Sequence, residues 1–239
     1  MEYPINEQTY QDLLSTRERM VSLSPKSNPR AIAYPFVPWI GRDILEGSRG
    51  IYFIGIATRR SWEPSENLEQ CRTSSEEYAA APDSGLFWRY VKAVTKAVFD
   101  RSYSESTNRI AWSNQFKIGL ESGNPSGDYA KAQQELCTLI LQRELQLASR
   151  CAVIFLGDTP ILEAYFQRKN WDAETHKEYG VWLRYTADGA PILYHYHPRA
   201  FALQSVQCDE LVTRISDTIR RWLVGPQTGL AEAKSLRIS

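Results

Sequence analysis

The segment Ile51-Tyr-Phe-Ile-Gly-Ile56 presents apolar side chains on both of its faces. Such a strand is typical of a parallel sheet that helices cover on both sides. Residues 152–156, Ala-Val-Ile-Phe-Leu, have the same character, and two further strands are predicted at residues 109–113 and 192–196. Helices are predicted between and after these strands, at residues 87–99, 128–149, 160–167 and 205–224. Because strands and helices alternate, we expect an α/β fold, a three-layer α/β/α sandwich with a mainly parallel four-stranded central sheet.

The chain shows no internal repeat and no low-complexity segment, so one domain with additions at its ends is the simplest organisation. Residues 1–47 are predicted to form a helix and an extended arm packed on the core. Residues 48–224 form the α/β domain, in which residues 181–185 and 192–196 are expected to pair as a hairpin. Residues 225–239 are expected to be a flexible C-terminal tail.

The 239 residues carry 28 Lys and Arg against 28 Asp and Glu, a formal net charge of zero. A neutral chain has no overall field that draws it to nucleic acid or to anionic lipid, so any contact with DNA must come from a local basic patch. No run of about 18 apolar residues occurs, and the N-terminus lacks the basic and apolar segments of a signal peptide. We therefore expect a cytoplasmic monomer that does not bind membranes.

Cysteine spacing argues against a metal centre. The four cysteines, Cys71, Cys137, Cys151 and Cys208, include no C-x-x-C pair. Zinc and iron–sulfur sites usually contain at least one such close pair. We expect buried, reduced thiols, with no metal cluster and no cofactor.

Polar residues follow the predicted strands, where α/β sheets bind their ligands. They are Asn114, Lys117, His197 and Arg199. The Asn114 amide offers both a donor and an acceptor, which suits the edge of a nucleic acid base, although an Asn can equally cap a turn. His197 is either a functional group or a structural histidine. Lys117 and Arg199 suit phosphate groups, or are solvated surface charges.

Five short motifs follow one another along the chain. They are Phe53-Ile-Gly-Ile-Ala57, Asp83-Ser-Gly85, Trp112-Ser-Asn-Gln-Phe-Lys117, Val153-Ile-Phe-Leu-Gly157 and Tyr196-His-Pro198. In this order and spacing, over about residues 48–222, the set resembles the uracil-DNA glycosylase superfamily. The resemblance implies an enzyme that extrudes a damaged or modified base from DNA and hydrolyses its N-glycosidic bond, leaving an abasic site.

The resemblance also implies roles for individual residues. His197, in the His-Pro motif, would donate a hydrogen bond to the base carbonyl and stabilise the departing anion. Asn114 would read the pyrimidine edge, Ala57 would lie at the base pocket, and Phe87 would offer a stacking surface. The DNA phosphates would be met by basic side chains of the same rim, namely Arg59, Arg60, Lys117 and Arg199. Phe201 or Leu203, just after the His-Pro motif, matches the position of the wedge that the family inserts into the base stack, and packing on the sheet is the alternative for both.

One position departs from the family pattern. Most branches place Asp, Asn or Glu where this chain has Ala57, and alanine cannot activate water. One branch with Ala there takes its catalytic Asp from a Gly-Asp-x-Ser-Gly-like segment before the first helix. Asp83-Ser-Gly85 is similar to that segment, although one residue shorter and without the preceding Gly. Asp83 is therefore the expected catalytic carboxylate, with Glu63 and Glu66 as alternatives.

The sequence does not specify which base is the substrate. Residues 58–84, 27 residues by count, read as a long polar loop, which suits a base bulkier than uracil. Anti-phage glycosylases that remove modified cytosines from phage DNA offer one such substrate class. The main alternative is a catalytically silent member of the superfamily that binds nucleic acid or a nucleotide, and Ala57 favours it. Glu135-Leu-Cys137 resembles a cluster-binding segment, but the C-x-x-C that precedes the first strand in iron–sulfur branches is missing.

Overall fold

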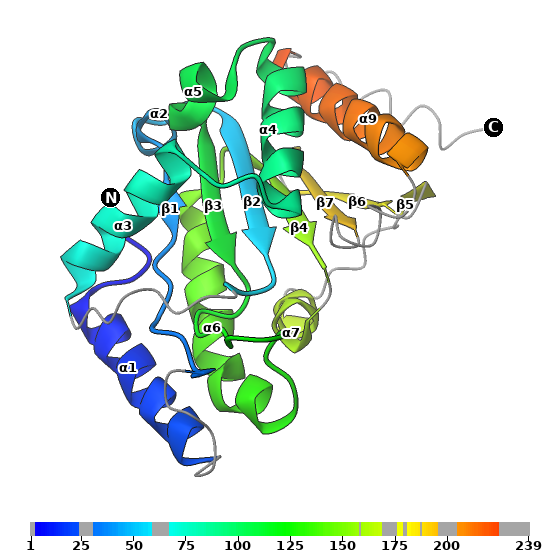
Figure 1. Cartoon of the computed structure of the whole chain (residues 1–239). Coiled ribbons are helices and arrows are strands. Elements are labelled where there is room, and N and C mark those ends of the chain that lie inside the picture. The colour runs from blue at the N-terminus through cyan, green and yellow to red at the C-terminus, as the bar shows by residue number, and fades with distance from the viewer. Residues whose placement is uncertain are drawn as a thin grey trace.

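The computed structural model describes residues 3–23, 31–58, 67–157, 159–168, 176–178, 181–186, 188–195 and 205–224. The predicted C-terminal tail, residues 225–239, lies outside them. The described residues form helices that cover both faces of a β-sheet (Figure 1). The α/β class predicted from the sequence is therefore confirmed.

The described part of the chain contains one mixed sheet of seven strands, in the order β1-β3-β2-β4-β7-β6-β5. The strands are β1 (Trp39–Ile40), β2 (Gly50–Gly55), β3 (Ile110–Asn114), β4 (Cys151–Leu156), β5 (His176–Glu178), β6 (Val181–Tyr185) and β7 (Pro191–His195). Neighbours among β3, β2, β4 and β7 are parallel, whereas β1, β6 and β5 are antiparallel to their neighbours. The predicted four-stranded sheet is too narrow, because these three strands extend it at both edges.

Strands β6 and β7 form the predicted hairpin. They pair antiparallel, with Val181 opposite His195 and Tyr185 opposite Pro191. Gly189 lies in the turn with a φ of 78°, a conformation that glycine adopts without a steric penalty. The hairpin is confirmed, and it puts His195 at the last position of β7.

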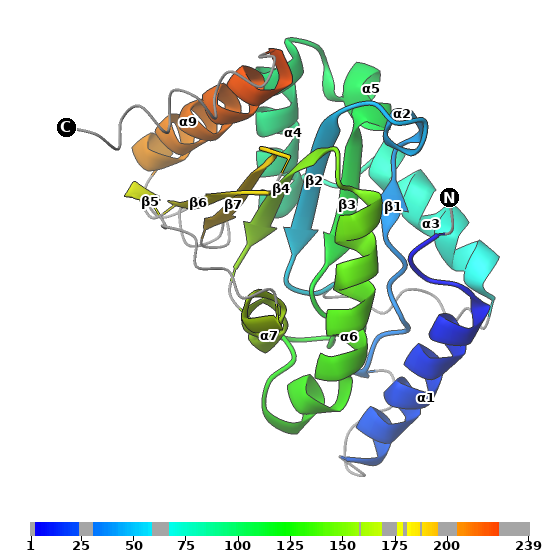
Figure 2. The ribbon, with the colours of Figure 1, turned by 180° about the vertical axis from the view of Figure 1, so that it is seen from behind.

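The helices lie within two residues of their predicted bounds wherever periodicity predicted one. They are α1 (Glu7–Ser22), α2 (Arg42–Leu45), α3 (Leu68–Ala80), α4 (Leu86–Phe99), α5 (Tyr103–Ser106), α6 (Gly127–Leu147), α7 (Pro160–Arg168) and α9 (Ser205–Val224), with a short 3-10 helix at Thr107–Arg109. Figure 1 shows α4 and α9 in front of the sheet, and Figure 2, from behind, shows α6 covering the opposite face. The layers follow from the strand pattern, since strands that are apolar on both faces need helices on both.

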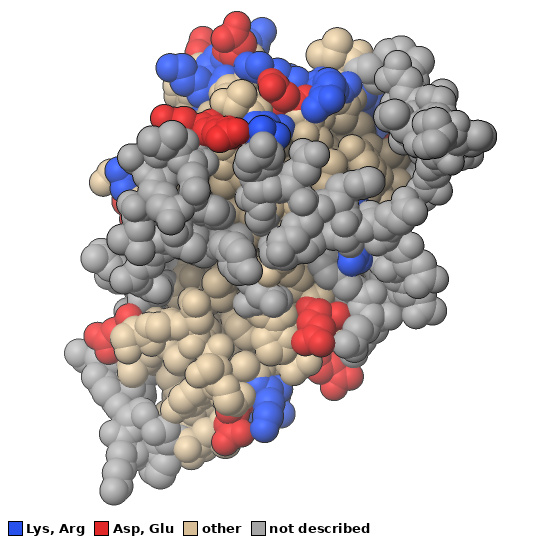
Figure 3. Space-filling model, turned by 90° about the vertical axis from the view of Figure 1, so that its right-hand side faces the viewer, with Lys and Arg blue, Asp and Glu red and all other residues tan. Residues whose placement is uncertain are grey.

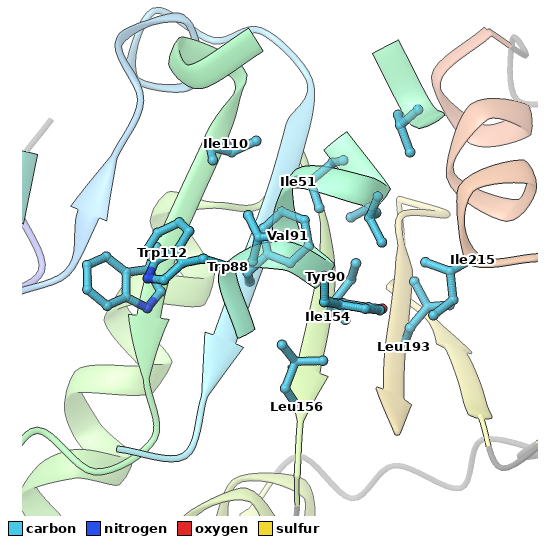
Figure 4. Close-up of a cluster of buried hydrophobic side chains, with 14 of the residues drawn as sticks. Ile51, Trp88, Tyr90, Val91, Ile110, Trp112, Ile154, Leu156, Leu193 and Ile215 are labelled. Atoms are coloured by element: carbon cyan, nitrogen blue, oxygen red, sulfur yellow. The ribbon is translucent and has the colours of Figure 1, made fainter. Parts of the chain in front are cut away.

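The face under α4 and α9 is rich in aromatic side chains. Trp88 of α4 and Trp112 of β3 lie with ring centroids 4.8 Å apart, and Val91 continues the apolar stripe of α4 onto Ile51 (Figure 4). Ile215 of α9 closes the same cluster above β7. This packing fixes α4 against the middle of the sheet, and its first turn lies against the end of β2.

The segment predicted as a loop over residues 58–84 contains a helix, α3. It begins after Asn67, whose side chain accepts a hydrogen bond from the Glu69 N–H at 2.8 Å. Its buried stripe is Leu68, Cys71, Ser75 and Ala79. Three of these four side chains are small, so the helical period carried little hydrophobic signal, and the loop prediction is wrong for residues 68–80.

The N-terminal helix α1 packs along α6. Tyr10 and Leu13 of α1 are fully buried with Ile140 of α6 in a third apolar cluster. The Tyr10 hydroxyl also lies 2.9 Å from Cys71 Sγ of α3. The arm after α1 adds β1 to the sheet edge, where Trp39 pairs with Trp112.

Candidate functional site

The carboxyl ends of β2, β3, β4 and β7 meet at one edge of the sheet, at the arrowheads in Figure 1. Gln115, which is fully buried, ties three of them together. Its N–H donates to Gly55 O at 2.8 Å, and its Nε2 donates to Gly157 O at 2.8 Å. Its Oε1 accepts a hydrogen bond from the Thr159 hydroxyl at the head of α7. The Gly157 N–H donates to His195 O at 2.9 Å, so the four strand ends form a connected frame.

Asn114 lies at the centre of this edge with only 4% of its surface exposed. A Cβ at Gly55 would be 2.6 Å from Asn114 Oδ1 and 3.3 Å from the Phe87 ring, so a glycine is needed for the amide to lie there. The Asn114 Nδ2 is buried and makes no hydrogen bond to any described residue. A buried donor without a partner costs about 1–3 kcal/mol, which a ligand acceptor would recover.

Phe87, in the first turn of α4, is the aromatic neighbour of Asn114. Its ring centroid lies 5.2 Å from that of Trp88 and 6.4 Å from that of Trp112, and its side chain is only partly buried. The structure therefore brings together Asn114 and Phe87, two of the three residues predicted to contact a base. Ala57, the third, is partly buried and packs against the apolar cluster on the α6 face.

Asp83 is exposed at the head of α4, four residues before Phe87. Its Oδ1 accepts from the Gly85 N–H at 2.8 Å, and its Oδ2 accepts from the Tyr78 hydroxyl at 2.8 Å. The Lys92 ammonium donates to the Asp83 carbonyl at 3.2 Å. Asp83 therefore orders the entry to α4, and its carboxylate lies just before the helix that carries Phe87.

His195 and Tyr90 form a buried pair that the sequence pattern did not single out. Both are buried, and the Tyr90 hydroxyl lies 2.7 Å from His195 Nε2. The alternation along this strand puts His195 and His197 on one face and predicts that at most one of them lies deep in the sheet; His195 is fully buried, and His197 lies outside the described residues. Tyr90 is on the inner face of α4, one turn after Phe87, so the pair joins α4 to the end of β7.

We expect Tyr90→Phe to lower the free energy of unfolding by about 1–3 kcal/mol, because a buried hydrogen bond to the His195 ring is lost. Urea denaturation followed by circular dichroism measures the change. Tyr129→Phe is the matched control, since Tyr129 is partly buried and no described residue bonds its hydroxyl; a shift within about 0.5 kcal/mol is expected there. Equal effects in the two variants would contradict the assigned role.

Lys117 is not a surface residue. Its side chain is fully buried, and its Nζ lies 2.8 Å from Glu144 Oε1 of α6, which is fully buried as well. The phosphate contact predicted for Lys117 is therefore wrong, because the chain after β3 turns inward and carries the ammonium under the sheet. The sequence alone does not indicate the direction of this turn, because a lysine after a strand end usually stays exposed to solvent.

Several predicted site residues lie outside the described residues. They are Arg59, Arg60, Glu63, Glu66, His197, Arg199, Phe201 and Leu203. Their roles stay predictions from the sequence.

The side of the molecule that carries α9 has a mixed charge pattern. In Figure 3 the Lys and Arg side chains near the top lie among Asp and Glu. Along α9, Arg214 is 3.0 Å from Glu210 and Arg220 is 3.5 Å from Asp217, all with exposed side chains. Within the part of this side that the structure describes, basic and acidic groups alternate, and no continuous basic patch is seen.

Burial controls the chemistry of two cysteine thiols. It raises the pKa of Cys137 to about 11 and that of Cys151 to about 12. No group of three or more His, Cys, Asp or Glu among the described residues could hold a metal ion. The helices of the described chain include none long and apolar enough to cross a bilayer.

Native Cys137 and Cys151 should resist thiol reagents at pH 8, where a pKa of about 11 leaves about one thiol in a thousand ionised. Since the ordinary thiol value is 9.0, the unfolded state releases these protons first as pH rises. The free energy of unfolding should therefore be unaffected by them below pH 9 and fall between about pH 9 and 11. Mass spectrometry of labelled peptides, from native and from urea-unfolded protein, tests the predicted protection of the two thiols. Rapid labelling of native Cys137 at pH 8 would refute that protection.

Comparison with known proteins adds no family: no protein-family model matches the sequence, and no curated protein matches it. The residues themselves therefore carry the functional argument.

Proposed function

We propose that this protein is a DNA glycosylase of the uracil-DNA glycosylase superfamily, which hydrolyses the N-glycosidic bond of a flipped-out base. The observation that carries the proposal is the buried, unpaired Nδ2 of Asn114 beside Phe87 and Gly55. An amide donor next to an aromatic ring, at the carboxyl end of a parallel sheet, suits the edge and the face of a base. The ordered motifs of the sequence point to the same chemistry.

In the proposed reaction, water attacks C1′ of the sugar and the base leaves with the electron pair of the N-glycosidic bond. Asn114 holds the base edge, and His197 donates a hydrogen bond to the base carbonyl as negative charge develops on it. Such a donor stabilises the transition state more than the ground state. Asp83 orients the water and stabilises the positive charge on the sugar. The products are an abasic sugar and a free base.

A modified cytosine, as in phage DNA, is a further substrate class of this proposal, but helix α3 occupies residues 68–80 of the segment whose length suggested a base bulkier than uracil. The Asn114 amide carries both a donor and an acceptor, so it can pair with a carbonyl or with an exocyclic amine. The same site therefore accommodates the edge of either pyrimidine.

The second candidate is a catalytically silent member of the superfamily that binds nucleic acid or a nucleotide. Ala57 favours it, since the position after β2 lacks the carboxylate that most branches use. Each carboxylate oxygen of Asp83 already accepts one hydrogen bond, from the Gly85 N–H or from the Tyr78 hydroxyl. This arrangement is compatible with a catalytic carboxylate and with one that only orders the start of α4.

The test is an abasic-site assay. Purified protein is incubated with end-labelled DNA that contains uracil and, in parallel, with virion DNA that contains hypermodified bases, and the products are cleaved with alkali. Strand scission at one kind of base supports the glycosylase. Binding without scission supports the silent member, and steep weakening of that binding with salt distinguishes DNA from a free nucleotide as its ligand.

A further inference from the structure

A buried ion pair lies directly behind Asn114. Lys117 Nζ donates to Ser113 Oγ at 2.7 Å and to Asn114 O at 2.5 Å, and it lies 2.8 Å from Glu144 Oε1. Both charged side chains are fully buried. One ammonium group therefore connects the last two residues of β3 to helix α6.

The pair contacts β3 from the α6 side of the sheet, whereas the Asn114 side chain meets Phe87 on the α4 side. Lys117 follows Asn114 by three residues, and its own N–H contacts Cys137 Sγ of α6 at 3.4 Å. Phe116, the residue before it, donates its N–H to Ile56 O at 2.8 Å. The chain thus leaves β3 and turns back, and Lys117 Nζ donates to the backbone carbonyl of Asn114, whose side-chain amide faces the candidate site.

Tyr52 of β2 belongs to the same buried group. Burial first, and then the negative charge of Glu144, raise the pKa of its hydroxyl. Neither Glu144 oxygen accepts a well-formed hydrogen bond from the described residues, so the lysine is its main compensation. Such a pair is a poor device for stability, since apolar residues of equal volume usually serve as well or better.

We propose that the Lys117–Glu144 pair is a positioning device for Asn114, which holds the backbone at the end of β3 so that Nδ2 points at the base. That Nδ2 faces a base rests on the proposed function. That the Lys117–Glu144 pair orders the Asn114 amide from the other side of the sheet does not depend on it. Lys117 and Glu144 are positioning residues, because neither touches the face that would receive the base.

The test uses the double variant K117M/E144L, in which apolar side chains of similar volume replace both charges. Two-dimensional NMR of the full chain follows the side-chain amide of Asn114, assigned through the loss of its signals in Asn114→Asp. We expect a rigid amide in the unchanged protein, with an order parameter near 0.85, and one below about 0.6 in the double variant. The melting temperature should change by only a few degrees.

The kinetic arm measures excision from DNA that carries the base released by the wild-type protein in the abasic-site assay. We expect kcat/KM to fall by about 10²-fold in the double variant, with kcat falling more than KM rises, because the base is still bound but misaligned. Ile140→Val, a buried substitution one turn earlier on α6, is the matched control for general loosening of that helix, and it should leave the amide and kcat unchanged.

Ser113→Ala provides a second route if K117M/E144L does not fold. It removes one acceptor of the ammonium and keeps the ion pair, so the Asn114 amide should loosen in the same direction by a smaller amount. An Asn114 amide that is equally ordered in every folded variant overturns the proposal, even if the protein cleaves DNA. A loosened amide in a protein that cleaves no DNA supports the positioning role and refutes the glycosylase.

Discussion

Asn114→Ala is expected to reduce kcat/KM for base excision by about 10²–10³-fold, the usual cost of removing one preorganised donor from a reacting centre. The Nδ2 has no partner among the described residues, so its loss leaves no protein acceptor unpaired. The free energy of unfolding should therefore stay the same or rise slightly, while activity falls. This combination separates a ligand-binding amide from one that caps a turn, because removal of a cap lowers stability.

Asn108→Ala is the control for Asn114→Ala. Asn108 is exposed at the opposite end of β3, in the 3-10 helix that precedes it, so it tests the strand without touching the site. Activity and stability should both match those of the unchanged protein. An Asn114→Ala variant with full activity would remove this residue from the site.

Asp83→Asn should reduce turnover by about 10²–10⁴-fold, the range that a positioned acid or base contributes. Asparagine keeps the Oδ1 that accepts from the Gly85 N–H, so the entry to α4 should persist and DNA binding should be retained. The substitution removes the negative charge, and it replaces Oδ2, which accepts from the Tyr78 hydroxyl, with an amide group that can instead donate to that hydroxyl. Single-turnover kinetics, together with binding measured by fluorescence anisotropy, separate these two effects.

Two comparisons make the Asp83 result decisive. Asp128→Asn, at an exposed carboxylate in the first turn of α6, should have no effect on turnover. If Glu63→Gln or Glu66→Gln abolishes turnover while Asp83→Asn does not, the catalytic carboxylate comes from the chain after β2, and Asp83 serves only to order the start of α4.

The central strands and the long helices were predictable because their patterns are strong. Strands β2 and β4 are buried at every position, so an unbroken apolar run marks them. Helix α4 carries an apolar stripe at helical spacing. In contrast, β1 and β5 have two and three residues, too few for any period, and only pairing with their neighbours makes them strands. Helix α3 was missed because small side chains form most of its buried stripe.

The candidate site was predictable in part. The position of Asn114 at a strand end follows from the chain order of strands and helices. The alternation along β7 indicated only that at most one of His195 and His197 lies deep in the sheet, and the burial of His195 comes from the structure. The buried state of Lys117 was not predictable, because it depends on the direction of the turn after β3 and on Glu144, a distant residue on α6. The Tyr90–His195 contact likewise joins residues 105 apart in the sequence.

Release of a free base from DNA is the most direct measurement of the central claim. Wild-type protein and Asn114→Ala are incubated with uracil-containing DNA and with virion DNA rich in modified pyrimidines, and small molecules in the filtrate are identified by mass spectrometry. The account predicts one free base, released by the wild-type protein and about 10²–10³-fold more slowly by Asn114→Ala. Folded wild-type protein that binds these DNAs and releases no base from any of them would contradict it.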